Sequence, residues 1–187
     1  MYSCILVTES ISDALKTALN DVTLNFKSSE STDSYVEAKP HVYTWTYDDV
    51  SNNMPINTPS VLVQMISMEN DTIDYIVHVC VCNPALQDKE ITNVIEGETD
   101  VYKYNDGDNI DSSGVRSDLY KSCVMLAECV FNALGRMNNS NFSLSEVHLD
   151  TPSPYLDNFP FCECSVSFTA SKANTETKIN TKLWEYL

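Results

Sequence analysis

Glycine is scarce in this sequence, and Gly97, Gly107, Gly114 and Gly135 are the only four in 187 residues. Loops that hold a phosphate through backbone amides need several glycines close together, so a P-loop or a dinucleotide-binding loop is excluded. The chain also lacks the Gly-x-Ser-x-Gly elbow of α/β-hydrolases and the His-Glu-x-x-His pair of zinc proteases. No familiar catalytic motif is therefore present in the sequence.

Basic residues are few as well. Eleven lysines and arginines stand against 27 acids, which gives a net charge of −16. None lies between His41 and Asp88 or between Met137 and Ser171. Ordinary nucleic-acid binding is disfavoured, because it needs clustered Lys and Arg to replace counterions. Solubility is the first interpretation of this charge, and a surface that repels or mimics DNA is the sharper one.

Long apolar runs are also missing, since no stretch approaches the ~20 residues needed to cross a bilayer. Met1 to Cys4 lacks the basic start of a signal peptide. Seven cysteines are an odd number for a disulfide framework. We therefore expect a protein without a membrane partner, made in a reducing cytoplasm, whose thiols are buried as small hydrophobic groups.

The strongest positive signal is an amphipathic segment from Val115 to Met137. Apolar residues recur there at steps of three and four, and charged or polar residues occupy the opposite side. Candidate N-caps are Asp111, Ser112 and Ser113, while Gly135 supplies a stop. A stripe this wide needs a broad surface to cover, and a sheet is the expected one.

Before this helix, the pattern predicts a short helix that starts at a capping box, Ser10 to Asp13, and ends near Asp21. Polar residues from Lys27 to Lys39 predict a mobile loop. Strands are predicted at Val42–Tyr47, Val61–Met68 and Ile73–Cys82, with a loop over Asp48–Pro59. The last two strands would form an antiparallel hairpin around Asn70-Asp71, and apolar residues on both faces predict a central position for both.

After the helix, Ser143–Leu149 alternates with Leu144, Glu146 and His148 on one side, and Phe159–Ala170 alternates more clearly. In the latter, Cys162, Cys164, Val166 and Phe168 point one way, which predicts a sheet with one covered face. The expected fold is α+β: a mostly antiparallel sheet with the long helix and the short N-terminal helix packed on one face. Residues 1–170 would form a single domain, with an acidic insertion at 83–113 that holds short strands at Val94-Ile95 and Val101-Tyr102, and 171–187 a C-terminal tail.

Few residues are candidates for chemistry. Cys80-x-Cys82 and Cys162-x-Cys164 suggest zinc, but zinc ligands usually flank a turn of two or more residues, so packing in the core is the favoured interpretation. His41, His78 and His148 lack a sequence spacing that pairs them with an orienting acid and a nucleophile. The acidic run Asn105–Asp111 fails the EF-hand pattern. We expect no catalytic residue, no metal and no cofactor.

The order of helix, strand, paired strands, long helix and paired strands resembles the tail-terminator, or tail-completion, proteins of tailed bacteriophages. About half the chain carries this resemblance, which is one of pattern rather than of a signature motif. The resembling stretches are Leu15–Val22, Pro59–Gln64, Tyr75–Cys82, Ser117–Leu134 and Phe159–Phe168.

The resemblance implies a non-enzymatic structural protein of the virion, assembled in the host cytoplasm. Such proteins form a homo-oligomeric ring in the tail or neck, with a hexamer favoured and a dodecamer possible. The ring joins the head-side connector or portal proteins to the tail tube, as tail terminator or head–tail connector, and DNA passes through it only as cargo.

Two sets of residues are expected to serve such a ring. Acids in the insertion would face the lumen or one ring face, where they would repel DNA: Glu96, Glu98, Asp100, Asp106, Asp108 and Asp111. Apolar residues at the C-terminus would either fold back on their own core or dock on a neighbour: Leu183, Trp184, Tyr186 and Leu187.

Two other functions stay open at this stage. An acidic DNA mimic, or an adaptor that binds another protein, would need carboxylates spaced like phosphates on one surface. A small hydrolase or transferase would need titratable side chains from distant parts of the chain to converge in a cleft.

Overall fold

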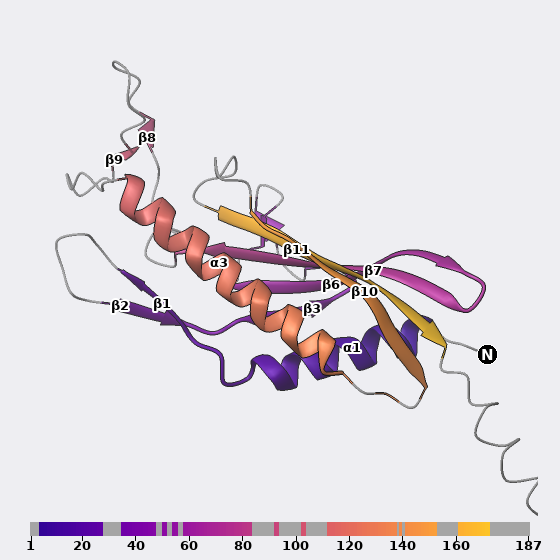
Figure 1. Ribbon diagram of the computed structural model, residues 1–187. Helices are drawn as coiled ribbons and strands as arrows, with labels where there is room; N and C mark the ends of the chain where they lie inside the picture. Colours follow the sequence, from indigo (N-terminus) through magenta and orange to yellow (C-terminus); the bar gives the residue numbers. More distant parts are fainter. Residues whose placement is uncertain are drawn as a thin grey trace, which may run out of the picture.

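The computed structural model describes residues 4–27, 35–47, 50–51, 54–55, 58–83, 92–93, 102–103, 112–137, 139, 141–152 and 161–172. Within these residues, helices α1 (Cys4–Leu19) and α3 (Ser112–Gly135) pack on one face of a five-stranded, mostly antiparallel sheet (Figure 1). The strands lie in the order β10 (Phe142–Asp150), β11 (Phe161–Lys172), β7 (Thr72–Cys82), β6 (Ser60–Glu69) and β3 (His41–Thr44). The predicted α+β class is confirmed.

The centre of the sheet is the predicted hairpin of β6 and β7. The chain turns at Asn70, whose φ of 51° lies in the left-handed region that asparagine tolerates better than most residues. Both strands lie inside the sheet, since β7 separates β6 from β11 and β6 separates β7 from β3. The apolar residues on both faces of these strands therefore correctly predicted their central place.

β3 is short and pairs in parallel with β6, from His41 beside Ser60 to Thr44 beside Val63. The predicted strand was to continue to Tyr47. It stops earlier because Trp45 takes a φ of 73°, which turns the backbone away from the extended conformation. The Trp45 amide still donates to the Val63 carbonyl at 3.0 Å.

α1 begins at Cys4, so the predicted start at a Ser10 capping box is wrong. Val7 and Ile11 are buried one helical turn apart, and Leu15 and Leu19 continue the same line. This apolar line extends to the N-terminal side of Ser10, and its burial against the sheet outweighs the local capping signal. The helix ends at Leu19, two residues before the predicted end.

The predicted loop from Lys27 to Lys39 is wrong in part. β2 (Tyr35–Ala38) lies inside this range and pairs with β1 (Leu24–Lys27), which precedes the predicted loop except for Lys27, while residues 28–34 are outside the described part. Leu24 and Phe26 are almost fully buried, and Asn25 between them is exposed. Two buried side chains anchor β1 in the fold. Its apolar–polar alternation is only a few residues long and is flanked by polar residues, so the sequence pattern does not reveal it.

Very short strands occur in one further predicted loop and in the predicted insertion. β4 (Val50–Ser51) pairs with β5 (Met54–Pro55) inside the predicted loop Asp48–Pro59. β8 (Thr92–Asn93) pairs with β9 (Tyr102–Lys103) inside the predicted insertion. Tyr102 was expected in a short strand, whereas the other predicted strand, Val94-Ile95, is outside the described residues.

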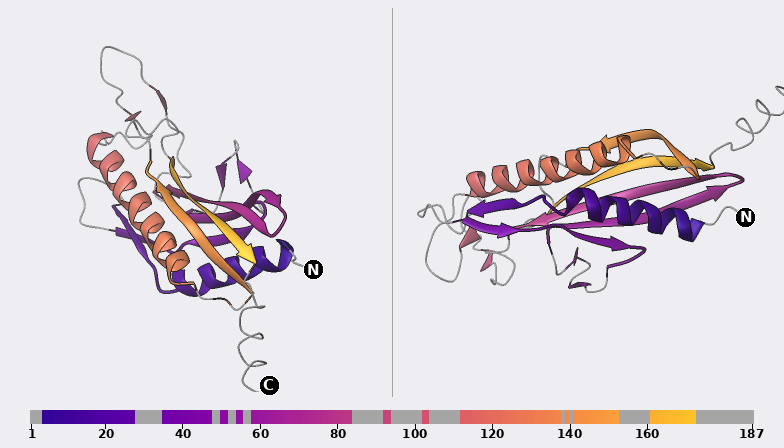
Figure 2. Two further views of the ribbon diagram at one scale, coloured as in Figure 1. Left: turned by 45° about the vertical axis from the view of Figure 1, so that its right-hand side comes forward. Right: turned by 90° about the horizontal axis from the view of Figure 1, so that it is seen from below.

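α3 has close to the predicted bounds, and its last residue is Gly135. Its predicted stripe is buried at Leu119, Cys123, Leu126, Val130 and Leu134. The right-hand view of Figure 2 shows α3 and the β4–β5 hairpin on opposite sides of the molecule. Neither helix in the described ranges combines the length and apolar content that a membrane span requires.

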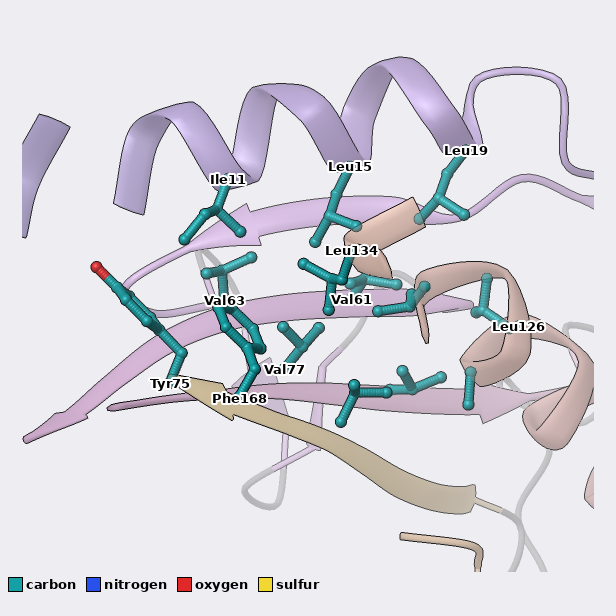
Figure 3. Packing of buried hydrophobic residues seen from close by; sticks show 14 of the residues in the cluster. Ile11, Leu15, Leu19, Val61, Val63, Tyr75, Val77, Leu126, Leu134 and Phe168 are labelled. Carbon is teal, nitrogen blue, oxygen red and sulfur yellow. The ribbon is translucent and has the colours of Figure 1, made fainter. Parts of the chain in front are cut away.

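The core lies between the helices and the sheet. Ile11, Leu15 and Leu19 of α1 face Val61, Val63 and Val77 of the central strands, and Leu126 and Leu134 enter from α3 (Figure 3). Each fully buried large apolar side chain stabilises the fold by about 1.5–3 kcal/mol. The sheet therefore holds both helices on the face that these residues share.

β10 follows its predicted alternation only as far as Ser145. Glu146 has a φ of 55°, and the register with β11 shifts between Ser145 and His148. Beyond this bulge Val147 and Leu149 pack against the core, while Glu146 and His148 are exposed. The predicted grouping of Leu144, Glu146 and His148 on one side is wrong, because a bulge reverses the faces that follow it.

β11 confirms the predicted single covered face. Cys162, Val166 and Phe168 are buried, Cys164 is partly buried, and Glu163 is exposed. The strand runs two residues beyond the predicted end at Ala170, so Ser171 and Lys172 belong to the sheet rather than to the tail.

Candidate functional surface

The sheet face opposite the two helices carries polar side chains from several strands. Four strands contribute to it, and none of its side chains is buried. We call it the open face, and the strand registers place on it Gln64, Ser67, Asp74, Ile76, His78, Ser145, His148, Asp150, Glu163, Ser165, Ser167 and Thr169.

Asp74 lies at the centre of one row of the open face. The Ser67 hydroxyl donates to its Oδ2 at 2.6 Å, and the Thr169 hydroxyl donates to its Oδ1 at 2.8 Å. These bonds, first that from Ser67 and then that from Thr169, hold the pKa of Asp74 below its usual value. The carboxylate is thus kept charged on an exposed surface, where it joins β6, β7 and β11.

His148, Asp150 and Ser165 form a second row at the sheet edge. His148 Nε2 lies 3.3 Å from Asp150 Oδ1, and the Ser165 hydroxyl donates to Asp150 Oδ2 at 3.3 Å. A nucleophilic serine must instead donate to the histidine that takes its proton. Because both side chains contact the carboxylate, this trio does not have the geometry of a hydrolytic triad.

His78 is the other histidine of the open face. Its Nε2 lies 3.1 Å from Gln64 Oε1 on the neighbouring strand. Burial lowers the pKa of His78, and the nearby charge of Glu163 opposes that shift. The neutral imidazole is therefore favoured in the folded protein. His41, the third histidine, is exposed on β3.

The charge of the open face has one sign. Asp74, Asp150 and Glu163 are acids of this face, Glu69 lies on it opposite Thr72 near the turn, and lysine and arginine do not occur among its residues. The first basic residue on these strands is Lys172, at the end of β11. An anion such as a nucleic-acid phosphate would be repelled by this surface within about 8 Å at physiological salt.

The end of the same sheet face nearest β3 is covered. Tyr43 packs edge to face on Tyr47 with ring centroids 5.3 Å apart, and Leu62, Cys80 and Cys82 are buried there. Burial raises the pKa of Tyr47 to about 12 and that of Cys82 to about 12. These groups are thus held neutral, which suits packing rather than proton transfer.

The two Cys-x-Cys pairs lie on opposite faces of the sheet. Cys162 pairs with Val81 and Cys164 with Val79, whereas Cys80 pairs with Glu163, and paired residues share a face. The four thiols therefore cannot surround one ion. Within the described ranges, no three His, Cys, Asp or Glu side chains are grouped to hold a metal. Cys80, Cys82 and Cys162 are buried, in agreement with the predicted core packing.

The candidates named from the resemblance lie elsewhere. The acidic residues Glu96 to Asp111 and the C-terminal residues Leu183 to Leu187 are all outside the described residues. Sequence reasoning found one strip of the open face, because Glu163, Ser165, Ser167 and Thr169 alternate with apolar residues. It missed the match of this strip with Asp74 and Asp150, which only strand order and register establish.

Exposed apolar side chains on β6 were also missed. Ile66 is 61% exposed and Met68 is 43% exposed. β3 pairs with β6 only as far as Val63, so it does not extend beside these residues. The hydrophobic run of β6 predicted a buried strand, but the register with β7 shifts between Met65 and Ser67, which leaves Ile66 without a paired residue on β7.

No protein-family model matches the chain, and no curated protein matches its sequence. The likeness to tail terminators therefore remains one of element order and pattern.

Proposed function

We propose that this protein is a non-enzymatic ring subunit of a bacteriophage tail or neck, a tail terminator or connector ring through which DNA passes. The observation that carries the proposal is the two-sided sheet, with helices on one face and, on the other, an acidic face that lacks lysine and arginine. In such a subunit, the helices stabilise the sheet from one side. Its other side is suited to line a channel through which a polyanion slides without being held.

Charge supports the same role. The net charge of −16 is spread over a chain in which the open face carries Asp74, Asp150 and Glu163 without a lysine or arginine. A closed ring would multiply these carboxylates around its axis and would repel phosphates over about a Debye length. We assign the lumen to the open face, in addition to the acidic residues Glu96 to Asp111 that the resemblance proposes.

Self-association is supported by the exposed part of β6. Ile66 and Met68 place large apolar groups on a strand that β3 covers only up to Val63. Burying such side chains against a neighbouring copy would stabilise the ring by removing apolar area from water. The ring would use this part of β6, together with the C-terminal residues Leu183 to Leu187.

The first experiment measures assembly. Full-length protein is examined by light scattering coupled to gel filtration over a concentration series, and the peak is imaged in negative stain. A closed ring is expected, with a hexamer favoured over a dodecamer. Ile66→Asp should weaken assembly, whereas Met125→Asp, at an exposed apolar residue of α3, should not. A strict monomer at every concentration contradicts the proposal.

The second experiment tests which face lines the channel. The triple variant Asp74→Lys, Asp150→Lys, Glu163→Lys should form rings that retain DNA at low salt and release it as salt rises. The control reverses three exposed acids on the helices, Glu9→Lys, Asp118→Lys and Glu128→Lys, for the same change in net charge. Equal DNA retention by both variants would contradict the assignment of the lumen to the open face.

An acidic DNA mimic is the alternative function, and the same open-face carboxylates favour it. A mimic would act as a monomer that captures a DNA-binding protein, and the open-face triple variant would lose that capture. The ring proposal expects the wild-type protein to assemble and to capture no such partner. Assembly state and capture therefore separate the two functions.

A further inference from the structure

Two thiols meet where α3 crosses β11. Cys123 of α3 and Cys164 of β11 have their Sγ atoms 3.4 Å apart, although 41 residues separate them in sequence. The Cys123 thiol also donates to the Cys162 carbonyl at 3.3 Å. Both cysteines are free thiols. The contact between α3 and β11 therefore contains two thiols that lie close enough to react with each other.

The distance is short for a pair of unbonded sulfurs. A disulfide bond is about 2.05 Å long, so bond formation would bring the two atoms closer by only about 1.4 Å. We expect rotation about the two Cα–Cβ bonds to supply this movement. Cys80 and Cys82 cannot compete for either sulfur, because they lie on the opposite face of the sheet.

We propose that Cys123 and Cys164 form a latent disulfide, which is reduced where the protein is made and closes when the folded protein meets an oxidising thiol–disulfide couple such as glutathione. This inference does not depend on the proposed ring. For a particle assembled in a reducing cytoplasm and released into an oxidising medium, the bond would form after release and would tie α3 to the sheet.

The two sulfurs have different access, which sets the order of the steps. Cys164 is partly exposed, whereas Cys123 is fully buried. The Cys164 thiolate therefore attacks oxidised glutathione first, forms a mixed disulfide and releases one glutathione thiolate. Cys123 then attacks the Cys164 sulfur and releases the second glutathione thiolate. The protons of the two cysteines go to these thiolates, so two cysteine thiols and one oxidised glutathione give one protein disulfide and two reduced glutathiones.

The second step is expected to be slow at neutral pH. Hydrogen bonds with Cys162 and Cys164, together with burial, raise the pKa of the Cys123 thiol. Only the thiolate is an effective nucleophile, and its fraction rises about tenfold for each pH unit below the pKa. Closure should therefore accelerate as pH rises, and this delay would keep the dithiol open during assembly.

The test maps the bond in full-length native protein. The protein is incubated in glutathione buffers of increasing oxidised fraction, free thiols are blocked with N-ethylmaleimide, and peptides are sequenced by mass spectrometry without reduction. A linked peptide pair that joins Cys123 to Cys164 is expected, together with a rise in the urea midpoint that reducing agent reverses.

Variants separate the pair from general thiol oxidation. Cys129→Ser, on the same helix but outside the pair, should leave the crosslink intact. Cys123→Ser should instead accumulate a stable mixed disulfide at Cys164, since the second sulfur is missing. Circular dichroism checks that each variant is folded. The proposal is overturned if the native wild-type protein yields a different pairing, or if this crosslink forms only in urea.

Discussion

The hydroxyl groups of Thr8 and Tyr75 lie 2.9 Å apart inside the protein, between α1 and β7. The Thr8 hydroxyl donates to the Cys4 carbonyl at 2.7 Å, and the Tyr75 hydroxyl lies 3.5 Å from the same carbonyl, so the two hydroxyls and this carbonyl form one buried group. The Tyr75 ring also stacks on Phe168 of β11, with centroids 5.3 Å apart. This buried polar contact therefore joins Thr8, near the start of α1, to Tyr75 of β7, 67 residues away in sequence.

This contact should appear in a double-mutant cycle. Tyr75→Phe keeps the stacked ring and loses the buried hydrogen bond, at a cost of about 0.5–1.5 kcal/mol in the free energy of unfolding. Thr8→Val removes the partner hydroxyl with nearly the same shape. The double variant should lose less than the sum of the two, with a coupling of about 0.5–3 kcal/mol measured by urea unfolding. Simple additivity would contradict the contact.

A substitution at Ser10 tests whether α1 starts there, as the sequence predicts, or at Cys4, as the structure shows. An N-cap serine changed to alanine costs about 0.5–2 kcal/mol. Because Ser10 lies inside the helix, Ser10→Ala should instead be neutral or stabilise the protein by a few tenths of a kcal/mol, since alanine is the better helix former. Chemical denaturation measures the sign. A loss of about 1 kcal/mol or more would show that the helix begins at Ser10.

The bulge of β10 predicts how glycine substitutions near Glu146 change the stability of the protein. At Glu146, φ is 55°, a conformation that glycine adopts without strain, and the side chain is exposed. Glu146→Gly should therefore be neutral or stabilising. The matched variant Ser145→Gly, at the preceding exposed position without a left-handed φ, should cost about 0.5–1 kcal/mol. Thermal unfolding of the two variants compares them, and equal losses would argue against the bulge.

Asp74 should contribute to the dependence of stability on pH. Its folded pKa is depressed, chiefly by the bond from Ser67 and then by that from Thr169. A carboxyl group with a depressed folded pKa stabilises the protein above its unfolded pKa of about 3.9, and the contribution is lost as pH falls through the folded pKa.

The wild-type protein should therefore lose more stability than Asp74→Asn between about pH 5 and about pH 2. Asp71→Asn, at an exposed carboxylate in the neighbouring turn, is the control and should behave like the wild type. Urea midpoints across this pH range provide the measurement. If Asp74→Asn retains the full wild-type slope, the hydrogen bonds to Asp74 do not set its pKa.

Element types followed from local pattern wherever the pattern was long. The stripe of α3 from Leu119 to Leu134 spans more than four helical turns, and the hairpin of β6 and β7 combines two apolar runs with an Asn-Asp turn. Short or interrupted patterns failed for physical reasons. The burial of Val7 moved the start of α1, and pairing with β1, which buries Leu24 and Phe26, made β2 a strand inside the predicted loop.

The candidate surface was only partly predictable for a related reason. The outward residues of β11 could be named from alternation, yet their partners Asp74 and Asp150 come from strands that are far apart in sequence. The bulge at Glu146 turns His148 to the open face beside Ser167, and the sequence around Glu146 contains no pattern that predicts this change of register. Charge, by contrast, was known from composition alone.

By itself the sequence determined the acidic charge and the scarcity of glycine, because both are matters of composition. It also predicted reduced thiols, and it predicted whether most segments are helix or strand, because that depends on the periodicity within one segment. Only the tertiary structure decided the strand order, the parallel pairing of β3, the separation of the two Cys-x-Cys pairs and the meeting of Cys123 with Cys164. Each of these is a contact between distant segments, whose free energy comes from the burial of whole faces rather than from any local preference.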